Sequence, residues 1–206
     1  MSELHDRPRL RRSDGEQTYA AILDAAVRLA SVEGLGSLTI GRLAQEVGVS
    51  KSGLYAHFGS KHRLQLDVMR VAREIFGREV MEPALTAPEG LAQLEALCAA
   101  YLSYIERRVF PGGCFFAGML AEFDAQEGSP HDEVAADQRE WTGLVRALAH
   151  QARAGGELDD AADLEQLVFD LTAAVEHANY YYVLFGDPDV LDRARTSVDA
   201  AIARAR

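Results

Sequence analysis

The amino-acid sequence predicts an all-α protein of about nine helices, divided between a short N-terminal group and a larger C-terminal bundle. Apolar residues recur three and four positions apart along most of the 206 residues, and no run alternates in the manner of a β-strand. Breaks rich in glycine and proline separate these helical runs. With 48% apolar residues, the chain can bury one large core or two small ones.

The first helix is expected to follow a flexible arm. Residues 1–14 mix arginines with few apolar side chains, a composition that predicts a basic, flexible segment. From Glu16 onward, apolar residues such as Ile22 and Ala26 recur at helical spacing. Gly34 follows where a left-handed helix cap is favoured, so the first helix should close there.

Two short helices should come next. Thr39 is placed to cap the first of them, which ends at Gly48. Ser50 is placed to cap the second, on which Leu54 and Phe58 lie four residues apart on one face. Two short helices joined by a turn, the second with a free outer face, make a helix-turn-helix unit. Spacing alone leaves open a second interpretation, two ordinary core helices.

The rest of the chain predicts longer helices. Ser60 caps a fourth helix that ends near Pro83 and is long enough to link two domains. Further helical runs are expected at roughly 89–109, 114–126, 132–154, 162–185 and 188–204. The last two carry apolar stripes, which suit either a helical bundle or a subunit interface.

Charge and composition narrow the function classes. The net charge is −11, but residues 1–73 contribute +3 and residues 74–206 contribute −14. A basic end on an acidic protein suits docking on nucleic acid by that end, although a solvated asymmetry without function is the alternative. No apolar run is long enough for a signal peptide or a membrane span, so we expect a soluble, cytoplasmic protein with no membrane partner. Two cysteines are too few for a disulfide framework.

A family resemblance is carried by residues 38–64, which read L-T-I-G-R-L-A-Q-E-V-G-V-S-K-S-G-L-Y-A-H-F-G-S-K-H-R-L. This stretch closely resembles the DNA-binding signature of TetR-family (TetR/AcrR-type) transcriptional regulators. The resemblance implies a repressor, not an enzyme, that binds a pseudo-palindromic operator as a homodimer, is released by a small-molecule inducer and needs no cofactor. It implies a basic arm (1–14), a helix-turn-helix domain (15–60) and a helical ligand-sensing and dimerisation domain (61–206).

The candidate DNA contacts lie on and around the second short helix. With Leu54 and Phe58 pointing inward, its outer face is free for a major groove, which just admits one helix. Many family members carry Arg where this chain has Gly41; Arg42 follows but projects about 100° further round the helix. The residues expected to contact DNA are Thr39, Arg42, Lys51, Ser52, Gly53, Tyr55, His57 and Lys61.

The candidate ligand pocket lies in the acidic, aromatic-rich part of the chain. The segment F-P-G-G-C-F-F at residues 110–116 resembles one subset of the family, for which no ligand is implied. Aromatic residues there suit a plain core as well as an apolar cleft. The residues expected to line the pocket are Phe115, Phe116, Met119, Trp141, Asp170, His177 and Tyr181.

Two rival functions remain open at this point. Cys114, in a Pro-Gly-Gly-Cys turn, could serve a small hydrolase or redox enzyme, although a packed apolar cysteine is the commoner outcome. The other rival is a regulator that activates transcription or acts through a protein partner. His131, His150 and His177 lack the spacing of metal ligands, so no metal site is expected.

Overall fold

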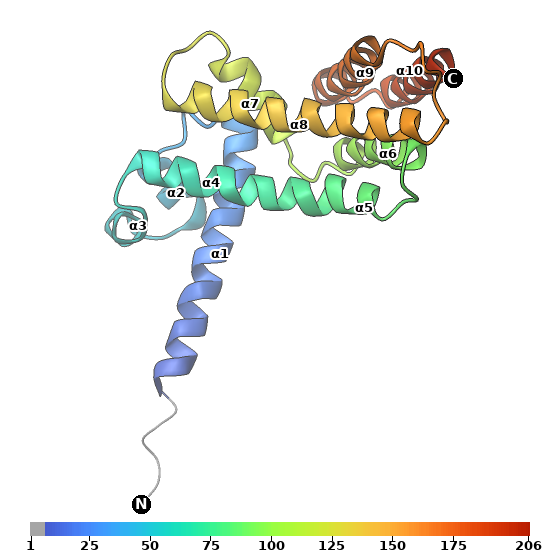
Figure 1. Cartoon of the computed structure of the whole chain (residues 1–206). Coiled ribbons are helices and arrows are strands. Elements are labelled where there is room, and N and C mark those ends of the chain that lie inside the picture. The colour runs from blue at the N-terminus through green and yellow to red at the C-terminus, as the bar shows by residue number, and fades with distance from the viewer. Residues whose placement is uncertain (1–6) are drawn as a thin grey trace, which may run out of the picture. The chain divides into compact units, whose positions relative to one another are not determined.

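The structure, a computed structural model, describes the backbone of residues 7–206 and the side chains of residues 17–128 and 130–206 (Figure 1). Over this part of the chain the regular elements are all helical, as the sequence predicts. The chain divides into two compact units, Met1–Arg73 and Glu74–Arg206. This division falls at the change from basic to acidic charge rather than at residue 60.

The N-terminal unit contains α1 (Arg7–Glu33), α2 (Ile40–Val47), α3 (Lys51–Phe58) and most of α4 (Lys61–Phe76). Because α1 begins at Arg7, residues 7–14 are helical, and the expected arm of residues 1–14 is wrong for this stretch. Pro8 lies in the first turn, where no backbone N–H is needed, and arginine and leucine are good helix formers. Residues 1–6 lie outside the described part of the chain.

The predicted caps fix α2 and α3 in place. The Thr39 hydroxyl accepts a hydrogen bond from the Arg42 backbone N–H at 3.0 Å, and the Ser50 hydroxyl accepts one from the Gly53 N–H at 3.1 Å. Gly48 ends α2 in the left-handed conformation with φ 69°, which glycine adopts without a steric penalty. The turn between the two helices is therefore specified by local chemistry.

The link between the two units is not a uniform helix. After α4 the chain forms one π-helical segment, η1 (Gly77–Met81), and then the short α5 (Glu82–Leu85). Pro83 lies in the first turn of α5, which tolerates proline, so the helical path continues to Leu85. The predicted fourth helix is thus three successive segments.

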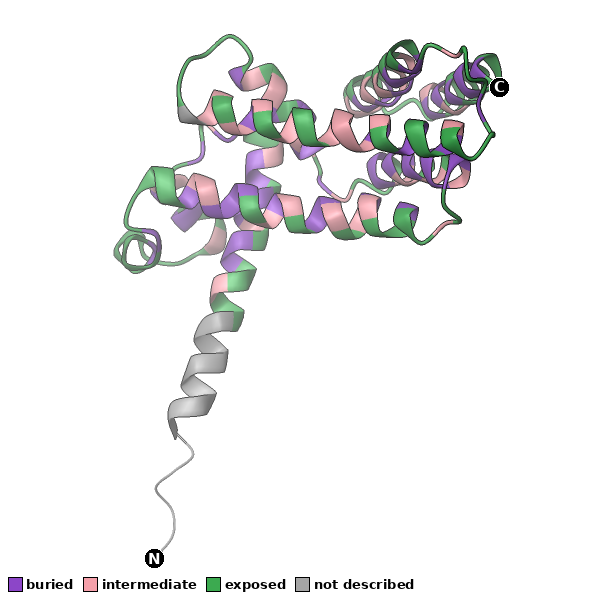
Figure 2. Cartoon of the chain, viewed as in Figure 1, coloured by how far each residue is buried: buried purple, intermediate pink, exposed green. Residues whose placement is uncertain are grey.

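The C-terminal unit contains the remaining helices: α6 (Leu91–Glu106), α7 (Phe115–Phe123), α8 (Ser129–Ala154), α9 (Leu164–Phe185) and α10 (Asp189–Ala205). Helices α9 and α10 pack side by side, and the buried residues of each helix gather on one side (Figures 1 and 2). The apolar stripes predicted for them, such as Leu171 on α9 and Val198 on α10, are buried inside this unit. Of the two roles that the stripes suit, they take that of an intramolecular core.

Candidate functional site

The outer side of α3 is the most exposed polar surface of the helix-turn-helix. Leu54 and Phe58 are buried, at 1% and 3% exposed, and hold α3 against its unit. The opposite side presents Lys51, Ser52, Tyr55 and His57, all exposed, and we call these four residues the α3 surface. Tyr55 leaves 55% of its surface open to solvent, so its ring and hydroxyl are accessible to a partner.

Lys51 lies across the beginning of α2. A Cβ atom placed on Gly41 would be 3.8 Å from Lys51 Cε, 4.0 Å from Lys51 Nζ and 3.9 Å from the Thr39 hydroxyl. These are ordinary contact distances, so the missing side chain at position 41 leaves room for the lysine. A shallow hollow here is lined by Thr39, Gly41, Arg42, Ala44, Gln45, Val49 and Lys51.

Arg42 is held by two carboxylates. Its guanidinium bonds to Glu33 on α1 at 2.6 Å and to Glu46 on α2 at 2.9 Å. A DNA contact by Arg42, as the sequence suggested, would have to displace both ion pairs. Through its ion pair with Glu33, Arg42 ties α2 to α1.

Gly53 and Lys61 also have partners inside the unit. A Cβ on Gly53 would lie 3.1 Å from the Ser50 hydroxyl, so glycine protects the cap of α3. The Lys61 ammonium donates a hydrogen bond to the Gly36 carbonyl, which ties the start of α4 to the loop after α1. Both residues lie near the α3 surface in sequence, and both make contacts within their own unit.

Two residues that the sequence interpretation missed support α3 from behind. The Tyr19 ring stacks on Phe58 at 5.4 Å and lies 5.9 Å from His57. Its hydroxyl donates to the buried Asp67 carboxylate on α4 at 3.0 Å, where Arg63 also donates. No local pattern indicates this tie, because Tyr19 and Asp67 are 48 positions apart.

The interior of the C-terminal unit is a cluster of rings centred on Phe76, the last residue of α4. Four rings meet Phe76 edge to face at 5.7–6.1 Å, and further rings continue the cluster towards α7. We call this cluster the aromatic interior; its members are Phe76, Tyr101, Tyr104, Phe110, Phe115, Phe116 and Trp141.

The seven predicted pocket residues separate into two groups. Phe115, Phe116 and Trp141 belong to the aromatic interior, and Met119 is buried. Asp170, His177 and Tyr181 lie instead on the far side of α9, as described below. The prediction of one pocket lined by all seven is therefore wrong. Aromatic residues are common both in cores and on surfaces. The spacing of residues along α9 does not say which side of the helix faces inward.

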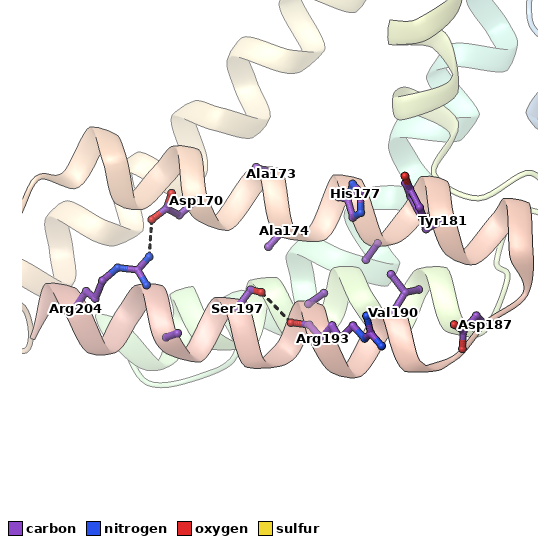
Figure 3. A pocket seen from close by; sticks show the side chains of 13 residues that line it. Asp170, Ala173, Ala174, His177, Tyr181, Asp187, Val190, Arg193, Ser197 and Arg204 are labelled. Atoms are coloured by element: carbon purple, nitrogen blue, oxygen red, sulfur yellow. Dashed lines mark hydrogen bonds and ion pairs between the residues drawn. The ribbon is translucent and has the colours of Figure 1, made fainter.

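The second group lines a groove between α9 and α10 (Figure 3). Asp170 on α9 and Arg204 on α10 form an ion pair at 2.7 Å across the groove, and the His177 and Tyr181 rings stack at 4.2 Å. Small side chains occupy the middle of the groove. The outer α9–α10 face, as we name it, comprises Asp170, Ala173, Ala174, His177, Tyr181, Val190, Arg193, Ser197, Ala200 and Arg204.

Both thiols are buried, and burial disfavours their thiolate forms. Burial raises the pKa of Cys98 to about 12 and also raises the pKa of Cys114. A nucleophilic or redox-sensing cysteine needs the opposite, an accessible thiolate of low pKa. Cys114 instead is the N-cap residue before α7, and its backbone N–H donates to the Asn179 amide oxygen of α9 at 2.8 Å.

The described residues contain neither a cluster of metal ligands nor a membrane-spanning helix. No group of three or more His, Cys, Asp or Glu side chains there is placed to hold a metal ion. No helix in that part of the chain is long and apolar enough to span a bilayer.

Comparisons with known proteins cover both units. Residues 22–68 match the family described as bacterial regulatory proteins, tetR family, and residues 90–198 match the tetracyclin repressor-like C-terminal domain. The transcriptional regulator AcrR of Shigella flexneri is 30% identical over 71 residues, which span 34% of this chain and 33% of that protein.

Solved structures show the same fold. A TetR transcriptional regulator from Chloroflexus aurantiacus matches 93% of this chain and 97% of its own, with a TM-score of 0.84 and 24% identity. AibR, crystallised with isovaleryl coenzyme A and operator DNA, matches 90% of this chain and 96% of its own, with a TM-score of 0.66 and 18% identity.

Proposed function

The chain belongs to the tetR family of bacterial regulatory proteins and is a DNA-binding transcriptional regulator, and from this premise we propose that it is a repressor, bound to a pseudo-palindromic operator as a homodimer and released by a small molecule. The observation that carries the proposal is the α3 surface, an exposed polar face on a helix whose other side is locked into the unit. Such a role places the protein in the cytoplasm with the chromosome.

We assign DNA contact to the residues that the structure leaves accessible. Lys51 opens α3, and the first residues of a recognition helix contact base edges in helix-turn-helix proteins. The hydroxyls of Thr39, Ser52 and Tyr55 are exposed on neighbouring surface and suit phosphate oxygens. His57, in the last turn of α3, suits a phosphate at the other end of the helix. Arg42, Gly53 and Lys61 are also accessible, but their side chains or backbone make contacts within the unit, so we assign them to shaping this surface.

The outer α9–α10 face suits a homodimer interface. Apolar side chains on α9 remain open to solvent next to it: Phe169 is 66% exposed, Leu184 73% and Phe185 65%. Exposed apolar residues gathered on one helix favour a partner surface. The small residues Ala173 and Ala200 on the face let a partner helix approach closely, so two copies of α9 and α10 suit a four-helix bundle.

The ligand is assigned to the aromatic interior rather than to the outer face. Rings and a buried methionine provide the apolar lining that small-molecule sites use. AibR, which shares the fold, was crystallised with an acyl coenzyme A and with operator DNA, so one such chain serves both kinds of partner. A ligand releases DNA only if it binds more tightly to the conformation that fits the operator less well.

Footprinting the promoter region of the protein's own gene tests the proposal. We expect a protected segment containing an inverted repeat, and a reporter driven by that promoter should rise when the gene is deleted. Loss of reporter activity on deletion would show an activator. An intact footprint with the Tyr55→Ala, Lys51→Ala double variant would remove α3 from the interface.

A further inference from the structure

Two buried polar atoms in the aromatic interior make no hydrogen bond of ordinary geometry to any described residue. They are the indole Nε1 of Trp141 on α8 and the hydroxyl of Tyr104 on α6, both shielded from solvent; the Phe115 backbone and the Cys114 thiol lie close to the Tyr104 hydroxyl without such geometry. Tyr104 is only 1% exposed. Buried polar groups in native proteins are paired in the great majority of cases, so two unpaired atoms in one cluster call for an explanation.

The two atoms belong to side chains that share the same neighbours. The Trp141 ring lies 5.3 Å from Tyr101 and 5.7 Å from Phe76, and the Tyr104 ring lies 6.1 Å and 5.7 Å from the same two rings. An indole N–H can only donate a hydrogen bond, and a phenol can donate one as well. A single acceptor atom among these rings would suit both groups.

A nearby carboxyl group adds a charge preference. Glu176 lies on α9 one turn before Asn179, whose amide oxygen bonds to Cys114 at the start of α7. It is half-buried and makes neither an ion pair nor a hydrogen bond with the described side chains. Burial raises the pKa of Glu176; burial is also the main cause of the raised pKa values of Tyr101 and Cys114, to which the negative charge of Glu176 makes a small addition. A second negative charge brought into this interior would be repelled.

We propose that the sensing site of this protein takes a compact, uncharged and largely apolar molecule with one accepting oxygen, such as a ketone or an ether, which receives hydrogen bonds from Trp141 and Tyr104. The inference rests on the proposed function, in which the C-terminal unit senses a small molecule. The rings provide the apolar walls, the two donors select the oxygen, and Glu176 excludes carboxylates and phosphates.

The single tryptophan provides a direct probe. Because Trp141 is the only tryptophan of the chain, the full-length protein labelled with ¹⁵N gives one indole N–H resonance. Four probes of similar size are titrated: acetophenone, ethylbenzene, benzoate and protonated 1-phenylethylamine. Acetophenone should shift this resonance downfield with saturation, whereas ethylbenzene, which has no acceptor, should bind at least fivefold more weakly.

Variants separate hydrogen bonding from packing. Tyr104→Phe keeps the ring and should weaken the binding of acetophenone about fivefold, since one neutral hydrogen bond contributes about that factor. The binding of ethylbenzene should not change. Tyr182→Phe, which removes a hydroxyl bonded to the Glu106 carbonyl elsewhere in the same unit, is the matched control and should change neither. Glu176→Gln should strengthen benzoate about tenfold and leave acetophenone unchanged.

The outcomes separate this inference from the proposed function. Equal binding of acetophenone and ethylbenzene, tighter binding of benzoate or of the amine, or no saturable shift with acetophenone would each overturn the inference. Operator release, measured separately by fluorescence anisotropy, tests the proposed function: acetophenone that binds at Trp141 without weakening operator binding leaves the site assigned and contradicts the inducer role.

Discussion

Lys51 and Arg42 are two cations of the helix-turn-helix with different surroundings. Sequence alone placed both on DNA, because a basic residue near a recognition helix favours contact with the groove or the phosphates. The structure leaves Lys51 exposed against Gly41, whereas Arg42 is bonded to Glu33 and Glu46. Ion pairs between residues nine positions apart are set by how helices meet, which the sequence pattern does not show.

Removal of Lys51 should change which operator is preferred. We expect Lys51→Ala to relax discrimination at one base pair of each half-site by about 1–3 kcal/mol, because a lysine on a base edge distinguishes that base from the others. The measurement is anisotropy with a panel of singly substituted operators. Arg42→Ala, the matched control, should keep the same base preferences. A uniform loss across the panel with Lys51→Ala would assign Lys51 to phosphate instead.

The two thiols should be inaccessible in the native protein. At a pH of about 8, alkylation of Cys98 and Cys114 by iodoacetamide should be on the order of a thousandfold slower than in concentrated urea, because it requires opening of the fold. The measurement is the rate of mass increase with and without urea. Rapid labelling of Cys114 in the native protein would revive the redox alternative.

Burial of Cys98 also predicts a dependence of stability on pH. Its folded pKa, about 12, lies above the ordinary value of 9.0, so the unfolded thiol loses its proton first as pH rises. The stability that the protonated Cys98 thiol gives the folded protein is complete below about pH 9 and is lost between about pH 9 and 12. The urea midpoint of the protein should fall as pH rises over this range, and the midpoint of the Cys98→Ala variant should fall less steeply. Parallel pH profiles for the two proteins would contradict the assignment.

Among the elements, those with local signals were predicted and those set by tertiary contacts were not. Thr39 and Ser50 specify their caps within three residues, so α2 and α3 were predicted closely. The start of α1 at Arg7 and the π-helical turn after Phe76 were missed. Neither has a local signature: a charged run suits an arm or a helix, and a π-turn depends on the packing around it.

The turn before α7 is fixed by its contact with α9. Gly113 has φ 86°, and a Cβ there would collide with the Asn179 amide oxygen and lie 2.5 Å from Val183 Cγ2. Gly156 has φ 73°, and among the described residues no atom beyond its chain neighbours lies within 4 Å of its Cβ position. Comparing Gly113 with Gly156 therefore separates the cost of backbone strain from the cost of a side-chain collision.

Substitution of the two glycines should differ in cost. We expect Gly156→Ala to destabilise the protein by about 1 kcal/mol, the cost of a left-handed alanine. Gly113→Ala should cost about 3 kcal/mol or more, because strain and overpacking combine. Urea unfolding of both variants provides the comparison. Equal losses of unfolding free energy would show that the turn before α7 can shift without disturbing α9.

At the scale of the whole molecule, the division into units follows charge. The change from basic to acidic composition near residue 73 coincides with the boundary inside α4. The orientation of α9 and α10 was harder to predict, because an apolar stripe has the same period whether it meets its own chain or a second copy. The stripe with Val198 is internal, which leaves the outer α9–α10 face for a partner.

Charging the outer face should separate the subunits. We expect Ala173→Arg to give folded monomers in sedimentation equilibrium, because an arginine on the exposed small-residue face blocks close approach of a partner helix. Ala147→Arg, an equally exposed helical position on α8, is the control and should remain dimeric. Val198→Asp should unfold the C-terminal unit instead, since Val198 is 5% exposed. A dimer that persists with Ala173→Arg would place the interface elsewhere.

Selection of binding sites from randomised duplex DNA by the full-length protein tests the central claim most directly, because it reports recognition and symmetry together. Two α3 helices in a homodimer read two equivalent half-sites, so the operator mirrors the twofold axis of the protein. We predict enrichment of an inverted repeat with a fixed spacing, lost when Lys51 and Tyr55 are both replaced by alanine. Enrichment of a single unrepeated site, or no enrichment over the starting pool, would contradict the account.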